Sequence, residues 1–189
     1  MTPAETKQLI GLLATKPRVG MRRALDMQIR GAALAQLGAL VVVVTGIVGY
    51  ISNSMMPVAE EAVAPSPLGY VVVAASNIVI SSFVFFWAGR AIKGEGDLQD
   101  VALALILHQA FMVLFPLWLS IVVLTVPSII GIAMIAGFVY LMYLMVGFIA
   151  EAHKFPSTWT ALLLIVGVLF LLAFALLFFV SLLGIAPPA

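Results

Sequence analysis

Residues 158–185 read TWTALLLIVGVLFLLAFALLFFVSLLGI, a run without a single charged side chain. A helix needs about 20 consecutive apolar residues to cross the roughly 30 Å hydrocarbon core of a bilayer. This run is long enough, and Pro187 and Pro188 follow it after Ala186. Because backbone polar groups in lipid must be satisfied within the chain, such a run is expected to form a transmembrane helix.

Four further apolar runs precede it, over residues 31–52, 68–89, 101–124 and 128–150. The chain is 64% hydrophobic and 9% charged, whereas a soluble domain carries about 25% charged residues. The sequence therefore predicts an all-α, polytopic integral membrane protein. We expect a five-helix membrane domain over residues 31–185, a basic cytoplasmic segment over residues 1–30 and a short tail over residues 186–189.

The basic residues predict the orientation. Six of the nine Lys and Arg residues precede the first span, Arg90 and Lys93 follow the second, and Lys154 follows the fourth. The connection between the first two spans carries only Glu60 and Glu61. Lys and Arg concentrate in cytoplasmic loops, so the N-terminus is expected in the cytoplasm and the C-terminus on the far side.

The basic segment before the first span has a helical pattern. Arg18, Arg22, Asp26 and Arg30 recur every four residues, which favours a short amphipathic helix over Lys16–Arg30 that rests on the cytoplasmic leaflet. The side chains expected to contact anionic lipid there are Arg18, Arg22, Arg23 and Arg30. The alternative is that these charges only set the topology.

The connection after the second span begins the stretch GEGDLQDVALAL, residues 94–105. Gly94 and Gly96 predict a flexible turn. Asp97 is placed to cap the third span and Asp100 lies in its first turn, where a carboxylate complements the helix dipole. A phosphate site at the glycines, or a metal site that adds Glu95, is the less favoured interpretation, because the Walker and calcium-loop patterns are both missing.

Polar residues inside the predicted spans are few, and none of them is Asp, Glu, Lys or Arg. Pro116 is expected to kink the third span, eight residues after His108 and therefore on a similar face. Asn77, His108, Gln109 and Pro116 form a candidate polar groove for a small or lipidic solute. The alternative is that the polar side chains make hydrogen bonds between helices.

The fourth span carries a stripe of small and aromatic residues at steps of three and four: Ile129, Ala133, Ala136, Tyr140, Tyr143, Gly147 and Ala150. It predicts close helix packing within the chain or, less favoured, between copies. The chain has no cysteine, and neither metal-ligand spacing nor a nucleophile–base pair is found. No metal, no cofactor and no enzymatic activity are expected.

The chain resembles the Yip1-domain family of five-span membrane proteins. The resemblance rests on the order of features: Lys16 and Pro17 with the basic helix, Trp87 and Arg90 before GEGDLQDVALAL, then Pro116, and finally Ala161 at the start of the fifth span. It implies a cytoplasmic N-terminus and no catalytic centre. The long N-terminal region and DLYGP motif of eukaryotic members are missing, so binding to Rab GTPases is not expected. The short form is similar to bacterial members, which implies an inner-membrane location.

Two functions remain open. The first is a non-enzymatic scaffold, or a protein that acts on lipid organisation, with anionic lipid as its partner. The second is a transporter or channel for a small or lipidic solute through the candidate groove. A second copy or another membrane protein is a further expected partner, and nucleic acid is not.

Overall fold

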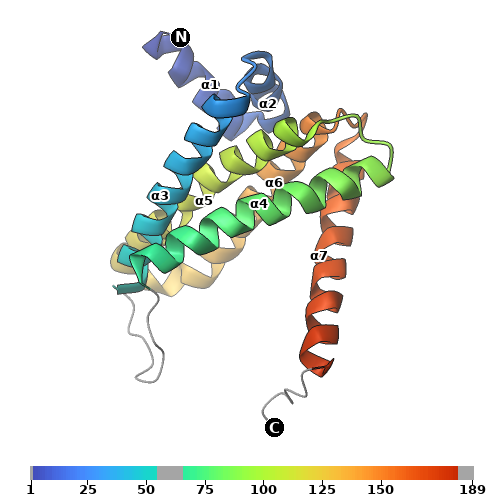
Figure 1. Ribbon diagram of the computed structural model, residues 1–189. Helices are drawn as coiled ribbons and strands as arrows, with labels where there is room; N and C mark the ends of the chain where they lie inside the picture. The colour runs from blue at the N-terminus through green and yellow to red at the C-terminus, as the bar shows by residue number, and fades with distance from the viewer. Residues whose placement is uncertain (1, 55–65, 183–189) are drawn as a thin grey trace.

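The computed structural model describes residues 2–54 and 66–182, and over these ranges the chain forms only helices and their connections (Figure 1). Five helices are long and apolar enough to cross a membrane: α3 (Gly31–Ser54), α4 (Pro67–Ala91), α5 (Leu98–Thr125), α6 (Ile130–Ala152) and α7 (Thr158–Leu182). A short 3-10 turn, η1 (Pro127–Ile129), leads into α6. The predicted all-α polytopic fold is confirmed. The predicted end of the fifth span and the tail lie outside the described residues.

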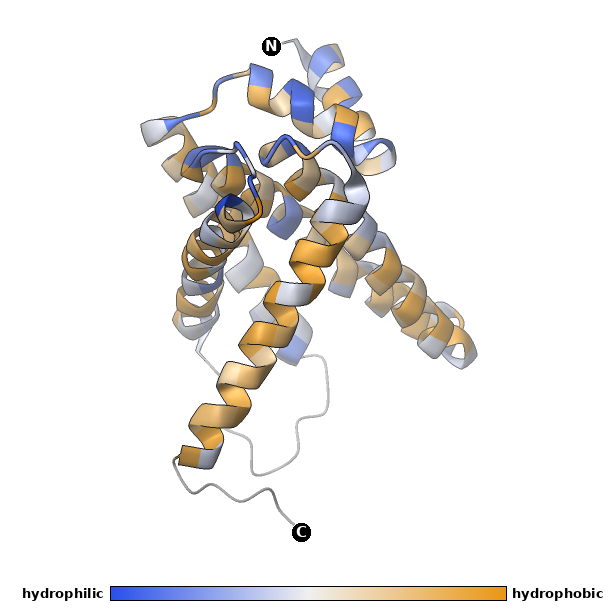
Figure 2. Cartoon of the chain, turned by 90° about the vertical axis from the view of Figure 1, so that its right-hand side faces the viewer, coloured by the Kyte–Doolittle hydropathy of each residue, from blue (hydrophilic) through white to orange (hydrophobic). Residues whose placement is uncertain are grey.

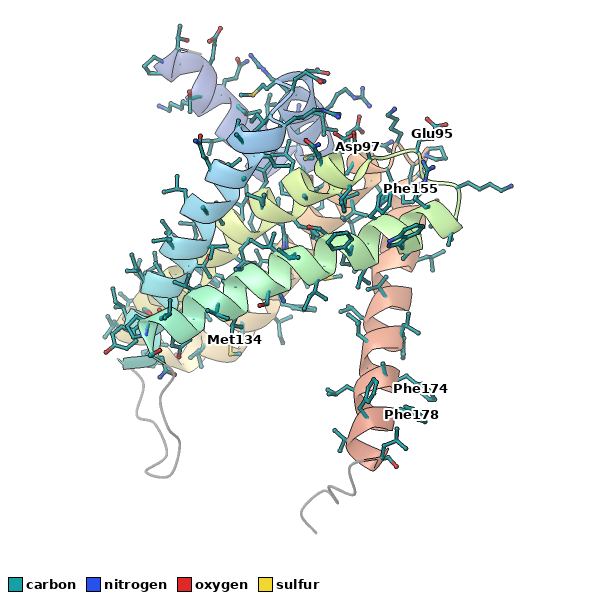
Figure 3. All side chains as sticks on the ribbon, viewed as in Figure 1. Glu95, Asp97, Met134, Phe155, Phe174 and Phe178 are labelled. Atoms are coloured by element: carbon teal, nitrogen blue, oxygen red, sulfur yellow. The ribbon has the colours of Figure 1, made fainter. Side chains whose placement is uncertain are left out.

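Helix α5 lies at the centre of the bundle. It packs against α3, α4 and α6, and α3 packs against α4. Helix α7 packs against α6 and α4 but diverges from them toward its C-terminal end (Figure 1). No side chain of α7 beyond Val168 is buried, up to the last described residue, Leu182. Lipid is therefore the expected neighbour of that half of the helix, which includes Phe174 and Phe178 (Figure 3).

One end of the molecule is hydrophilic and carries all nine Lys and Arg residues (Figure 2). We call it the charged end. It consists of two short helices, α1 (Pro3–Thr15) and α2 (Pro17–Asp26), the connections formed by residues 27–30, 92–97 and 153–157, and the last turns of α4 and α6. The three buried polar residues of the described chain include Glu151 and His153, which both lie at this end.

The helix predicted over Lys16–Arg30 is wrong at its C-terminal end. Helix α2 begins at Pro17, as a proline in the first turn favours, but it ends at Asp26 because Gln28 adopts a left-handed φ of 52°. Helix α1 precedes it and was not predicted. The two helices pack against each other, and α2 packs on α6. We call α1, Lys16 and α2 the N-terminal corner.

Candidate functional site

A stripe on α6 holds the N-terminal corner. Tyr140, Tyr143, Gly147 and Glu151 are spaced by three and four residues, so they share one helix face. The Tyr140 hydroxyl donates to the carbonyl oxygen of Ala14 at 3.0 Å, and the Tyr143 hydroxyl donates to that of Thr15, also at 3.0 Å. Part of the predicted seam thus packs within the chain, against the corner.

The rest of the predicted seam divides between two environments. Ala133 and Ala150 are buried, whereas Ile129 and Ala136 are exposed. The side of α6 that faces α5 uses different residues: Gly137, on which the Phe115 ring lies, and the fully buried Leu144 and Phe148. Packing within the chain is thus seen along most of the predicted seam, but not at the exposed Ile129 and Ala136.

Gly147 lets the corner approach α6 closely. A Cβ at this position would lie 2.7 Å from both Cβ and Cγ of Pro17, which is closer than packed carbons tolerate. Met21 and Ala24, on the same side of α2, are almost completely buried. The corner is therefore packed on the bundle by apolar contact as well as by hydrogen bonds.

Glu151 is the charged residue at the centre of this contact, and its side chain is only 10% exposed. The Nε of Arg18 lies 2.9 Å from Oε2 of Glu151, and the Nε of Arg22 lies 2.6 Å from Oε1. Arg18 also donates to the carbonyl oxygens of Phe155 and Pro156. One carboxylate thus joins α2 to the end of α6, and Arg18 extends the link to the next connection.

A second ion-pair cluster joins the start of α3 to the start of α5. Arg30 contacts Asp97 at 2.6 Å and Asp100 at 2.9 Å. Asp97 caps α5, since its carboxylate accepts from the backbone N–H of Asp100 at 2.8 Å. Partial burial opposes ionisation of Asp97, but this N–H and Arg30 outweigh it and lower its pKa below the ordinary value. These contacts are structural and need no bound ligand.

The four arginines predicted to contact lipid therefore have different partners in the structure. Arg18, Arg22 and Arg30 all pair with carboxylates of the chain, and Arg23 donates to the side-chain oxygen of Gln8 at 3.0 Å. The sequence pattern identified a charged helix face correctly, but it could not show that Glu151 would lie against that face.

Gly94 and Gly96 do not form the predicted flexible turn. Both are buried, and the backbone N–H of Glu95 donates to the His153 carbonyl at 3.0 Å. A Cβ on Gly96 would overlap the carbonyl oxygen of Ala152, and one on Gly94 would lie 2.8 Å from Nδ1 of His153. The two glycines are needed for close packing of the connections at the charged end, where Figure 3 also places Glu95, Asp97 and Phe155.

His153 lies at the centre of these connections and is completely buried. Its Nε2 lies 3.1 Å from the carbonyl oxygen of Phe85, so this nitrogen carries the proton. Its ring stacks on Phe155, and Nδ1 has no hydrogen-bond partner among the described residues. Burial lowers the pKa of His153, the Phe85 hydrogen bond partly opposes this shift, and Arg90 adds to it.

We expect stability to decrease as the pH falls below the ordinary histidine value of 6.5. In that range the unfolded chain binds a proton that the folded chain rejects, so protonation favours unfolding. The measurement is the thermal unfolding midpoint in mild detergent between about pH 7.5 and pH 5.5. The His153→Gln variant keeps a donor for Phe85 and should lose much of this dependence; an unchanged dependence in the variant would contradict the assignment.

The two tyrosine hydroxyls permit a milder test of how the corner is held. Changing both Tyr140 and Tyr143 to Phe removes two hydrogen bonds and keeps the rings, so we expect a loss of about 1–2 kcal/mol in the stability of the corner. Faster amide exchange in residues 3–26 measures it. Tyr70→Phe, at the opposite end of the molecule, is the matched control and should leave that exchange unchanged.

The candidate polar groove is dispersed over the structure. Asn77 lies on an exposed position of α4, whereas Nε2 of His108, on α5, lies 3.2 Å from the Leu141 carbonyl oxygen on α6. Pro116 lies inside α5, where its carbonyl accepts from Ser120 at 2.8 Å. The contact of His108 is the helix-to-helix hydrogen bond that the sequence left as an alternative. Among the described residues, no hydrogen bond joins Gln109 or Asn77 to His108.

No three His, Asp or Glu side chains within residues 2–54 and 66–182 are grouped so that they could hold a metal ion. The sequence matches the family profile described as the Yip1 domain over residues 10–180, which is most of the chain. No curated protein and no solved structure shows a significant match.

Proposed function

The chain belongs to the Yip1-domain family, and from this premise we propose that it acts without catalysis, as a membrane protein that organises anionic lipid at the cytoplasmic leaflet. The positive-inside rule supports a cytoplasmic position for the charged end, because all nine Lys and Arg lie there. A bacterial inner membrane, with the C-terminus on the periplasmic side, fits this orientation.

One observation carries the proposal: the charged end keeps an unneutralised excess of positive charge. Three arginines pair with Glu151, Asp97 and Asp100. The other six basic residues form no close ion pair among the residues that the structure describes: Lys7, Lys16, Arg23, Arg90, Lys93 and Lys154. Weaker electrostatic interactions join Arg23 to Glu5 and Lys154 to Asp100. Nine basic and six acidic side chains at this end leave an excess of three positive charges. Each basic residue near an anionic bilayer surface contributes about 1 kcal/mol of attraction.

The position of these cations supports a lipid role over a purely topological one. The corner that carries Lys7, Lys16 and Arg23 is fixed to α6, so its charges stay beside the bundle. Trp87 and Trp159 are exposed near the ends of α4 and α7 that adjoin the charged end, where aromatic rings anchor helices at the lipid headgroups. Cations and aromatic residues thus lie at the level expected for lipid phosphates.

The proposal is tested with spin-labelled lipids in reconstituted vesicles of phosphatidylcholine. We expect the protein to immobilise labelled phosphatidylglycerol in preference to labelled phosphatidylcholine, and added salt to weaken that preference. A variant with Lys7, Arg23, Arg90, Lys93 and Lys154 changed to Gln should lose most of it, because five cations without close ion pairs are removed. The ion pairs of Arg18, Arg22 and Arg30 remain, so the corner should stay folded. Equal immobilisation of both lipids by the wild type would refute the function. Reporters fused before Met1 and after Ala189 test the orientation and should lie on opposite sides.

A further inference from the structure

The charged end opens on one side into a groove between α2, α6 and α7. Its volume is about 500 Å³. Its walls are mostly apolar and are formed by Val19, Val139, Met142, Val146 and Leu162. An apolar groove that opens toward lipid accommodates a hydrocarbon chain without leaving polar groups unsatisfied.

The rim of this groove is cationic. Lys16, Arg18 and Thr158 line it. Arg18 is occupied by Glu151 and by two backbone carbonyls, whereas Lys16 is exposed and has no acidic partner in the described part of the chain. A free ammonium group and a hydroxyl therefore adjoin the apolar walls, which is the arrangement that complements a phosphate with an acyl chain attached.

Three other grooves of similar size in the described part of the chain lack this combination. The groove between α4 and α7, of about 470 Å³, adjoins the charged end and includes Thr160, but no charged residue lines it. The groove between α3, α4 and α5, of about 580 Å³, begins at Gly31 and Gln99, where the neighbouring Arg30 is neutralised by Asp97 and Asp100. The groove that Ile10 and Ala14 form with α5 and α6 has no charged residue in its lining. Charge thus distinguishes the α2–α6–α7 groove.

The length of the groove suits one leaflet. On α6 its lining runs from Gly147 to Val139, which is about 12 Å at a rise of 1.5 Å per residue. Half of the hydrocarbon core is roughly 15 Å. The groove thus follows most of an acyl chain from the cytoplasmic surface toward the bilayer centre.

We propose that the α2–α6–α7 groove binds one anionic diacyl phospholipid of the cytoplasmic leaflet, with its phosphate at Lys16 and Thr158 and an acyl chain along α6. This inference rests on the proposed function, since it takes the charged end to be cytoplasmic and the partner to be anionic lipid. It adds a defined site and a stoichiometry to a general surface preference.

Native mass spectrometry of the full chain, titrated with phosphatidylglycerol or phosphatidylcholine, tests the site. The wild type should bind one phosphatidylglycerol ahead of any further lipid. Lys16→Gln should weaken that first binding about fivefold, and Val146→Trp, which fills the groove without changing charge, should abolish it. Lys93→Gln removes an exposed cation outside the groove and should leave it unchanged. Inorganic phosphate in excess should not displace the lipid.

The outcomes separate the two proposals. Retention of the first lipid by both Lys16→Gln and Val146→Trp overturns the groove but leaves the general preference of the charged end intact. Displacement of the lipid by inorganic phosphate also overturns the groove, because it shows that no acyl chain is needed. A loss of first-lipid binding in Lys93→Gln equal to that in Lys16→Gln overturns it too, because diffuse charge would then be enough. A wild type that prefers neither lipid in any assay overturns both.

Discussion

Replacing Glu151 with glutamine should release the N-terminal corner from the bundle. The substitution keeps the shape of the side chain but removes the carboxylate with which both Arg18 and Arg22 pair. Loss of one partner of a buried ion pair costs about 3–5 kcal/mol. The two arginine side chains are 33% and 65% exposed, so water screens much of this effect and we expect about 1–3 kcal/mol. Proteolysis at Arg22 and Arg23, with amide exchange in residues 3–26, measures the release.

Glu95→Gln is the matched control, because Glu95 is an exposed carboxylate of the charged end without an ion pair to any described residue. It should leave proteolysis unchanged. The spans should stay folded in both variants, since their apolar contacts do not involve Glu151. A corner that stays equally protected in Glu151→Gln would show that Pro17, Met21 and the tyrosine hydroxyls hold it without the ion pairs.

The membrane spans could be predicted from the sequence because bilayer thickness limits them. A spanning helix needs about 20 apolar residues and makes its backbone hydrogen bonds internally. The length of each apolar run therefore decides whether it forms a transmembrane helix, with little influence from tertiary contacts. The run at residues 158–185 is a clear case: α7 starts at Thr158, as predicted, although much of the helix has no protein neighbour. Prediction succeeds where lipid, rather than another helix, is the environment.

The corner could not be predicted in the same way because its structure depends on contacts over more than a hundred residues. Glu151 lies directly after the predicted end of the fourth span, and nothing near it in sequence shows that Arg18 would cover it. Helix α1 did have a local signal: Thr2 and Glu5 form a capping box, with Thr2 N and Glu5 Oε2 2.7 Å apart. The basic residues that follow it form the more prominent pattern in the sequence.

The glycines after the second span show a different limit. Gly94 and Gly96 have the composition of a flexible turn, and a sequence pattern cannot distinguish a glycine needed for mobility from one needed for close approach. In the structure the left-handed residue of this connection is Lys93, with φ of 66°. The glycines instead leave room for the ring of His153 and for the end of α6. The two interpretations predict opposite results for a single added methyl group.

Gly96→Ala should therefore destabilise the protein strongly. The added Cβ would overlap the Ala152 carbonyl oxygen and lie 3.1 Å from the Cα of His153. Both neighbours are backbone atoms, which no change of rotamer can move aside, so we expect a loss of about 2–3 kcal/mol. Gly167→Ala is the control: its Cβ would meet nothing within 4 Å, and a helical alanine should be neutral or stabilise by up to about 1 kcal/mol. In mild detergent, the unfolding midpoint of Gly96→Ala should thus fall well below that of the wild type. The midpoint of Gly167→Ala should stay the same or rise. A Gly96→Ala protein as stable as Gly167→Ala would mean that residues 92–97 are free to shift away from α6, as a flexible turn would be.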